Sequence, residues 1–182
     1  MNYSAILTCF SLLTLNSCKK EDKRNFENSI SYWHQKEINV PDSIIIYHNN
    51  KKINVKTVKF FNRKSKLVSF IDNDCSNCTF SQLLFWKEFY NQYKNKDNFE
   101  LILIYNGLND YFCNVIYQES DVQLPIILDE SGYFIKNNSI FERQLYRTVL
   151  LDSENKILLI GDFRGNRKLE NLYLEEIDKT KP

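Results

Sequence analysis

Proline and glycine are scarce in this sequence, whose 182 residues include three Pro and four Gly. So few turn-forming residues predict a compact domain with few long loops. No internal repeat is present, and a chain of this length suits one domain. The formal net charge is +1, which gives no indication of a nucleic-acid partner.

Histidine is scarcer still, because His34 and His48 are the two residues of this type. A zinc site needs four ligands, and the one Cys-x-x-Cys motif has neither a second such motif nor a His pair after it. A copper-handling site of similar kind would need a His later in the chain, and none follows His48. The sequence therefore predicts no metal and no cofactor.

Charged residues are absent from the first seventeen positions, where Ala5–Leu15 is an apolar stretch. This stretch is too short to span a bilayer but suits the apolar region of an export signal. Leu15-Asn16-Ser17-Cys18 resembles a bacterial lipoprotein cleavage box. The resemblance implies that residues 1–17 are a signal peptide and that Cys18 becomes lipidated. The alternative, an uncleaved anchor, would need a longer apolar run.

The segment from Lys19 to Arg24 is charged and has no apolar side chain, which predicts a solvated tether over residues 18–39. Lys20-Glu21-Asp22 resembles a signal that sends lipoproteins of the Bacteroidetes type to the outer surface. The lipoprotein resemblance implies a place in the cell envelope, anchored to a bacterial membrane through Cys18, on its periplasmic or outer-surface face. Disulfides are permitted in that compartment.

A Cys-Ser-Asn-Cys motif at positions 75–78 is the most informative feature. It follows the apolar run Leu67–Ile71 and opens a helical pattern over 79–93. Positions i and i+3 of a helix share a face, so both sulfurs can come within disulfide reach. The helix N-terminus favours a thiolate at Cys75. A strand, this motif and a helix in succession predict a thioredoxin-like redox site at Cys75 and Cys78. A structural disulfide and half a zinc site are the alternatives.

The other three cysteines are not expected to belong to this pair. Cys9 leaves with the signal peptide, and Cys18 carries lipid. Cys113 lies alone in the apolar face of a predicted helix, Asn109–Glu119. A lone buried Cys usually acts as a small hydrophobic residue, and a third redox partner is the alternative.

Strands alternate with helices and the chain ends in a hairpin and a helix, which predicts a mixed central sheet with helices on both faces. The first two strands flank an Asn49-Asn50 turn. The predicted strands are Ser43–Tyr47, Ile53–Phe60, Leu67–Ile71, Phe99–Tyr105, Pro125–Leu128, Thr148–Leu151 and Ile157–Ile160. The predicted helices are Thr79–Tyr93, Asn109–Glu119, Phe134–Phe141 and Lys168–Ile177.

With this order of elements, the chain resembles the TlpA/ResA type of membrane-tethered thiol-disulfide oxidoreductases. Leu124–Gly132 and Thr148–Asp152 are similar to that family's inserted strand and to its strand beside the active site. Over residues 40–182 the resemblance implies a thioredoxin-like α/β fold with a mixed sheet flanked by helices, an N-terminal hairpin and an inserted strand-helix. The implied partners are protein thiols and disulfides, together with an unidentified upstream electron donor.

Two features of that family are missing. Its members place Trp directly before the first Cys, where this chain has Asp74. They also place a cis-proline beside the disulfide. Either Pro125 takes that position, or Pro125 begins the inserted strand and residues 146–148 form the turn. The second alignment is favoured because the closing hairpin and final helix must come last. The chain then lacks the cis-proline, and Arg147 and Thr148 form the substrate-facing turn. Arg147 either holds an anion or thiolate, or is a surface residue.

The resemblance implies a reductive mechanism. Cys75 attacks a substrate disulfide, and Cys78, more buried one turn along, resolves the mixed disulfide. Asp72 is a candidate proton acceptor, with an exposed helix cap as the alternative. Asp72 and Asp74 oppose ionisation of Cys75, which predicts a reductase-like potential.

Two other functions stay open. A peroxide-reducing enzyme of the same fold also carries an Arg before its facing strand, but it requires Pro and Thr at the positions of Val68 and Asp72. A non-catalytic surface lipoprotein with a structural or relic disulfide is favoured by the missing Trp and cis-proline.

Overall fold

The structure, a computed structural model, describes residues 28, 30–71, 73, 75–95 and 99–179. The chain divides into two units, residues 1–34 and 35–182, and the second contains the sheet. The predicted signal peptide, the lipidation site Cys18, and both Asp72 and Asp74 lie outside the described residues.

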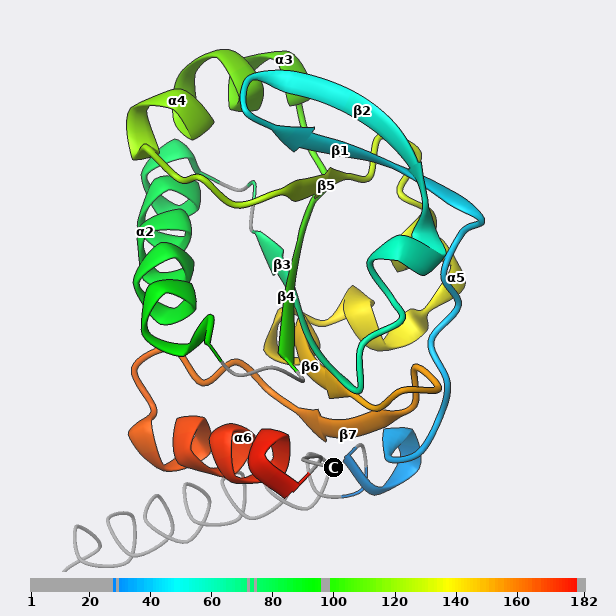
Figure 1. Cartoon of the computed structure of the whole chain (residues 1–182). Coiled ribbons are helices and arrows are strands. Elements are labelled where there is room, and N and C mark those ends of the chain that lie inside the picture. The colour runs from blue at the N-terminus through cyan, green and yellow to red at the C-terminus, as the bar shows by residue number, and fades with distance from the viewer. Residues whose placement is uncertain (1–27, 29, 72, 74, 96–98, 180–182) are drawn as a thin grey trace, which may run out of the picture. The chain divides into compact units, whose positions relative to one another are not determined.

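Seven strands form one mixed sheet in the order β2-β1-β5-β4-β3-β6-β7 (Figure 1). The central strands β3, β4 and β5 are parallel, and every other pairing is antiparallel. This topology confirms the predicted thioredoxin-like α/β fold, with β1 and β2 as the N-terminal hairpin and β5 as the inserted strand. The strands are β1 (Ser43–His48), β2 (Lys51–Lys56), β3 (Ser65–Ile71), β4 (Phe99–Tyr105), β5 (Ile126–Leu128), β6 (Thr148–Leu151) and β7 (Ile157–Ile160).

The hairpin turns at Asn49 and Asn50, whose φ angles of 49° and 58° suit the tight turn that Asn favours. The second strand ends at Lys56, earlier than predicted, and a 3-10 turn, η1 (Thr57–Lys59), follows it. Backbone N–H groups of Phe60 and Phe61 both donate to the Thr57 carbonyl oxygen, and Phe61 becomes buried. Burial of this ring therefore turns the chain away from the edge of the sheet.

Helices cover both faces of the sheet, as Figure 1 shows for α2 (Ser76–Tyr93) and α5 (Tyr133–Asn137). Trp86 of α2 is fully buried and meets Phe163 with ring centroids 5.5 Å apart, in the same core as the C-terminal helix α6 (Arg167–Lys179). On the other face, the ring centroids of Phe134 in α5 and Phe70 in β3 lie 6.4 Å apart. The strand before the cysteine motif is therefore buried on both sides, as its continuous apolar run predicts.

Two predicted helices are interrupted. The predicted 109–119 helix consists of α3 (Asn109–Tyr111), a π-helical segment η2 (Phe112–Ile116) and α4 (Tyr117–Ser120). The predicted 134–141 helix is α5 followed by a 3-10 segment, η3 (Ser139–Glu142). Between α5 and η3, buried Asn138 accepts from Asn39 N–H at 2.6 Å and donates to the Phe134 carbonyl oxygen at 3.0 Å. This long-range contact ends α5, and helical periodicity does not reveal it.

Residues 35–38 belong to the second unit and pair with the β7 hairpin. Gln35 N–H donates to the Ile157 carbonyl oxygen at 2.8 Å, and Ile38 N–H to that of Asn155 at 3.0 Å. Ile38 is 2% exposed. These contacts pair the segment with the first residue of β7 and with the turn before it. Within the part of the chain that the structure describes, no helix has the length and apolar character needed to cross a membrane.

Candidate redox site

Cys75 and Cys78 are joined by a disulfide, with their Cα atoms 5.2 Å apart. Cys75 is the N-cap of α2 and has an extended backbone, with φ −152° and ψ 144°. Its Sγ accepts a hydrogen bond from the Cys78 backbone N–H at 3.0 Å. The predicted position of the pair at the start of the helix is thus confirmed, and this N–H supplies part of the polarity that favours a thiolate there.

Both cysteines are exposed residues. Burial in α2 begins at Thr79, which is 1% exposed. That Cys78 is more buried than Cys75 stays a prediction. Thr79 also holds the turn, since its Oγ1 donates to the Cys75 carbonyl oxygen at 3.1 Å. An external thiol can thus approach either end of the disulfide.

The loop before the disulfide is tied to the loop after β4. The Asn73 side-chain amide donates to the Asn106 carbonyl oxygen. Gly107 lies beneath this contact, because a Cβ atom there would stand 2.7 Å from Tyr105 Oη and 3.0 Å from Asn73 Nδ2. The sequence analysis missed these residues. An Asn-Gly pair directly after a buried strand, at the edge where the motif lies, is the signal that could have indicated them.

The turn before β6 lies on the other side of β3. Phe70 N–H donates to the Arg147 carbonyl oxygen at 2.9 Å, and Arg147, half-buried, donates from Nε to the Phe141 carbonyl oxygen at 3.3 Å. Thr148 is 1% exposed, and its Oγ1 lies 2.9 Å from Ser69 Oγ. The Thr148 side chain is therefore buried against β3. That the turn at Arg147 and Thr148 faces a substrate stays a prediction.

Strand pairing decides between the two alignments of proline. Pro125 precedes β5, which pairs with β1 and β4, whereas β6 pairs with β3. The alignment in which Pro125 begins the inserted strand is therefore correct. The described residues contain no cis peptide bond.

Cys113 is a free cysteine in the core, 3% exposed. Burial raises the pKa of its thiol to about 11, against the opposing effect of Lys52. A buried thiol that stays protonated at neutral pH is a poor nucleophile. This environment favours the interpretation of Cys113 as a small hydrophobic residue over that of a third redox partner.

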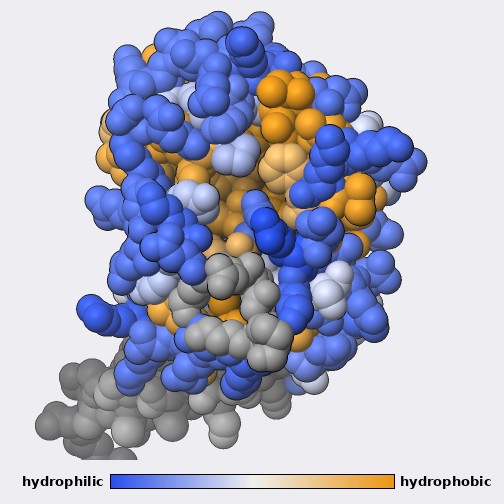
Figure 2. Space-filling model, in the orientation of Figure 1, coloured by the Kyte–Doolittle hydropathy of each residue, from blue (hydrophilic) through white to orange (hydrophobic). Residues whose placement is uncertain are grey.

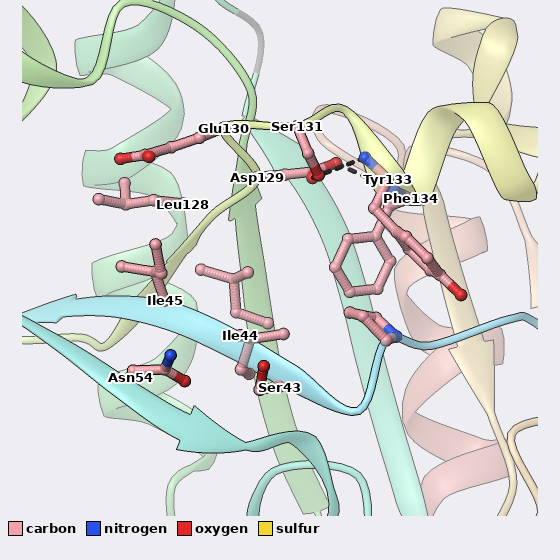
Figure 3. Close-up of a pocket in the computed structure, with 12 residues that line it drawn as sticks. Ser43, Ile44, Ile45, Asn54, Leu128, Asp129, Glu130, Ser131, Tyr133 and Phe134 are labelled. Carbon is pink, nitrogen blue, oxygen red and sulfur yellow. Dashed lines mark hydrogen bonds between the residues drawn. The ribbon is translucent and has the colours of Figure 1, made fainter.

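A pocket of about 320 Å³ opens where the β1–β5 ladder ends, beyond the pair Ile45 and Leu128 (Figure 3). Ile44 and Phe134 also line it, and Glu130 stands at its rim. The sequence analysis did not predict this pocket. Within the described residues, no cluster of three His, Cys, Asp or Glu side chains could hold a metal ion.

No protein-family model and no curated protein sequence matches the chain. Solved structures do resemble it. The thioredoxin domain of a thiol-disulfide oxidoreductase from Bacteroides vulgatus matches with a TM-score of 0.53 and 16% identity, over 77% of this chain and 97% of that one. StoA from Bacillus subtilis matches with a TM-score of 0.51 and 17% identity, over 74% and 98%. The mitochondrial 2-Cys peroxiredoxin from Plasmodium falciparum matches with a TM-score of 0.57 and 17% identity, over 80% and 92%.

These likenesses define the class of fold: the chain is thioredoxin-like, and it carries a disulfide at the N-terminus of the helix that follows its central strand. The matches include a thiol-disulfide oxidoreductase and a peroxiredoxin, so activity has to be argued from the site.

Proposed function

We propose that the protein is a thiol-disulfide oxidoreductase that reduces disulfides of exported proteins. The observation that carries this proposal is the exposed Cys75–Cys78 disulfide at the N-terminus of α2, with the Cys78 N–H directed at Cys75 Sγ. A buried staple would need neither exposure nor a donor aimed at one sulfur.

In the proposed reaction, the reduced Cys75 thiolate attacks one sulfur of a substrate disulfide, whose other sulfur leaves as a thiolate. The Cys78 thiol passes its proton to a base, for which Asp72 is the candidate. The Cys78 thiolate then attacks Cys75 Sγ, which forms the Cys75–Cys78 disulfide and releases the second substrate sulfur as a thiolate. Two electrons pass to the substrate, whose sulfurs leave as thiolates or thiols. A thiol donor upstream returns the pair to the dithiol form.

The surroundings support a reducing rather than an oxidising potential. Asp72 and Asp74 precede the motif in sequence, and negative charge there opposes the thiolate that would stabilise the reduced form. Arg147 belongs to the neighbouring turn, which Phe70 binds. The proposed location is the cell envelope, with lipid on Cys18 as the tether.

The test is the redox potential of the pair, measured on the full chain equilibrated with glutathione or dithiothreitol. A working reductase should show fast exchange at roughly −270 mV, whereas slow exchange below about −300 mV would mark a structural disulfide. A Cys78→Ser variant should then accumulate mixed disulfides through Cys75, with Cys113→Ser as the matched control that accumulates none.

One alternative keeps support from a specific observation. The turn over residues 146–148 contains no proline, so it lacks the cis-proline that presents substrates in the resembled family. A non-catalytic lipoprotein with a structural disulfide would share this feature. A peroxidase is disfavoured because Val68, fully buried, stands where that chemistry requires Pro.

A further inference from the structure

The near-neutral net charge conceals an uneven distribution. Residues 43–71 contain seven Lys or Arg residues and no Asp or Glu. The rest of the chain therefore holds 17 basic residues against 23 acidic ones. Six of the seven are exposed and make up what we call the basic edge: Lys51, Lys52, Lys56, Lys59, Arg63 and Lys64.

The fold places most of the basic residues of segment 43–71 at the protein surface. β2 is an edge strand that pairs with β1 alone, and the 3-10 turn and loop after it continue along the surface (Figure 1). Two aliphatic side chains stand among the charges, Ile53 at 44% and Val58 at 63% exposed. Most of the face in Figure 2 is likewise hydrophilic, with hydrophobic residues gathered in places.

Few of these charges form ion pairs with the residues that the structure describes. Lys52 Nζ lies 3.3 Å from Glu130 and 3.7 Å from Asp110, and Arg63 lies 3.4 Å from Glu100. For the other four members of the basic edge, no ion pair is found with the residues that the structure describes. Their cationic ends are therefore available to an external anion.

We propose that the basic edge docks the domain on an anionic lipid surface. Lysines close to such a surface are attracted by its negative potential, and their apolar stems can lie along the interface. Ile53 and Val58 supply aliphatic groups of the kind that enter it. The inference goes beyond the proposed redox activity and uses residues of the domain alone, so it depends neither on acylation of Cys18 nor on the disulfide.

Other occupants fit less well. Two copies of the chain meeting edge to edge would bring their own lysines together, and such strands resist pairing. Single-stranded nucleic acid needs exposed aromatic rings, but Phe60 is half-buried and Phe61 is 5% exposed. An acidic polypeptide could also bind the basic edge, so the experiment must distinguish it from a lipid surface.

The sheet order gives this docking a geometric meaning. The disulfide follows β3. In the strand order β2-β1-β5-β4-β3, this strand lies four strand spacings from the edge strand β2. At about 4.8 Å per spacing, β3 lies roughly 19 Å from β2 within the sheet. The disulfide follows the end of β3 opposite to the one that Arg63 and Lys64 precede. Partners would then meet the disulfide beside the membrane rather than against it.

The experiment is co-sedimentation of the full chain with phosphatidylglycerol vesicles and with phosphatidylcholine vesicles. The variant K51E/K56E/K59E tests the edge, and K94E/K168E/K179E, which makes the same change in net charge elsewhere, is its control. Equal thermal midpoints establish that both variants fold. Binding through the apolar residues 5–15 is common to all proteins and to both lipids.

We expect affinity for phosphatidylglycerol to fall about fivefold for each edge lysine lost, or about a hundredfold for the triple variant. The control should stay close to the parent. Equal weakening of both variants, or no preference of the parent for phosphatidylglycerol, overturns the proposal. I53S/V58S should weaken vesicle binding but not polyglutamate binding, and the reverse result would assign the edge to an acidic polypeptide.

Discussion

Lys66 is fully buried in β3, and its Nζ donates a hydrogen bond to the Phe61 carbonyl oxygen at 3.3 Å. A buried ammonium normally requires a carboxylate partner, and here Asp152 acts only at longer range. Burial lowers the pKa of Lys66 to about 8, with Asp152 raising it in opposition. Folding therefore disfavours the charged form of Lys66, which still predominates at neutral pH because the lowered pKa lies above 7.

The free energy of unfolding should rise with pH because of this residue. Its folded pKa of about 8 lies below the ordinary 10.5, so the unfolded chain binds more protons between these values. Cys113 acts oppositely above its ordinary pKa of 9.0, because its folded pKa is about 11. Urea unfolding from about pH 7 to about pH 9 should thus show a rise of about 1 kcal/mol.

Two variants isolate that effect. Lys66→Met should remove the rise and stabilise the protein at neutral pH by about 2–3 kcal/mol, because the cost of burying an ammonium disappears. Lys56→Met changes an exposed lysine and should preserve the rise. A rise that survives in Lys66→Met would assign it to another group.

The hydroxyls of Ser69 and Thr148 form a buried pair between β3 and β6. Thr148→Val should lower the free energy of unfolding by about 1–3 kcal/mol, because it leaves Ser69 Oγ without this partner. The double variant Ser69→Ala/Thr148→Val should cost clearly less than the two single variants together. Additive costs in urea unfolding would show that the two hydroxyls are independent.

Substitution of the neighbouring residues Asp129 and Glu130 should change the free energy of unfolding by different amounts. Asp129 accepts from the backbone N–H groups of Tyr133 at 2.8 Å and Phe134 at 3.0 Å, so it caps the start of α5. Asp129→Ala should therefore destabilise the protein by about 1–2 kcal/mol. Glu130→Ala removes an exposed pair with Lys52 and should cost less than about 1 kcal/mol. Equal effects on the thermal midpoint would contradict the capping role.

Gly107 should tolerate no side chain. In Gly107→Ala the new Cβ would stand 2.7 Å from the hydroxyl of Tyr105, a ring that stacks on Phe112 at 3.9 Å and cannot easily move. We expect a loss of about 1–3 kcal/mol in the free energy of unfolding. Gly165→Ala is the control, since its φ of 74° costs backbone strain but its Cβ meets no neighbour. A loss at Gly107 no greater than at Gly165 would exclude the steric explanation.

Local sequence patterns predicted most of the elements of the fold. The apolar run of β3, the helical spacing of α2 and the turn residues Asn49 and Asn50 each agree with the structure, because each depends on a few consecutive residues. The position of the cysteine pair followed from the same local order. Strand bounds were correct for β4, β6 and β7.

What the sequence did not reveal depends on distant contacts. The break after α5 comes from Asn39 reaching Asn138, and the clamp before the disulfide joins Asn73 to Asn106. The burial of Thr148 required knowledge of which residue of β3 lies opposite it. No periodicity within one segment encodes such pairings.

The sheet also sets the order in which the chain can be completed. The first hairpin packs beside β5, with Ile45 opposite Leu128, so its neighbour lies more than 80 residues further along. At about 5–20 residues per second, a growing chain keeps that hairpin waiting for roughly 4–16 s. Throughout that interval the inner edge of β1 has no strand to pair with. The sheet can therefore be completed only after the second half of the chain is synthesised. A chain released or cleaved before residue 126 would expose an unpaired strand edge that can aggregate.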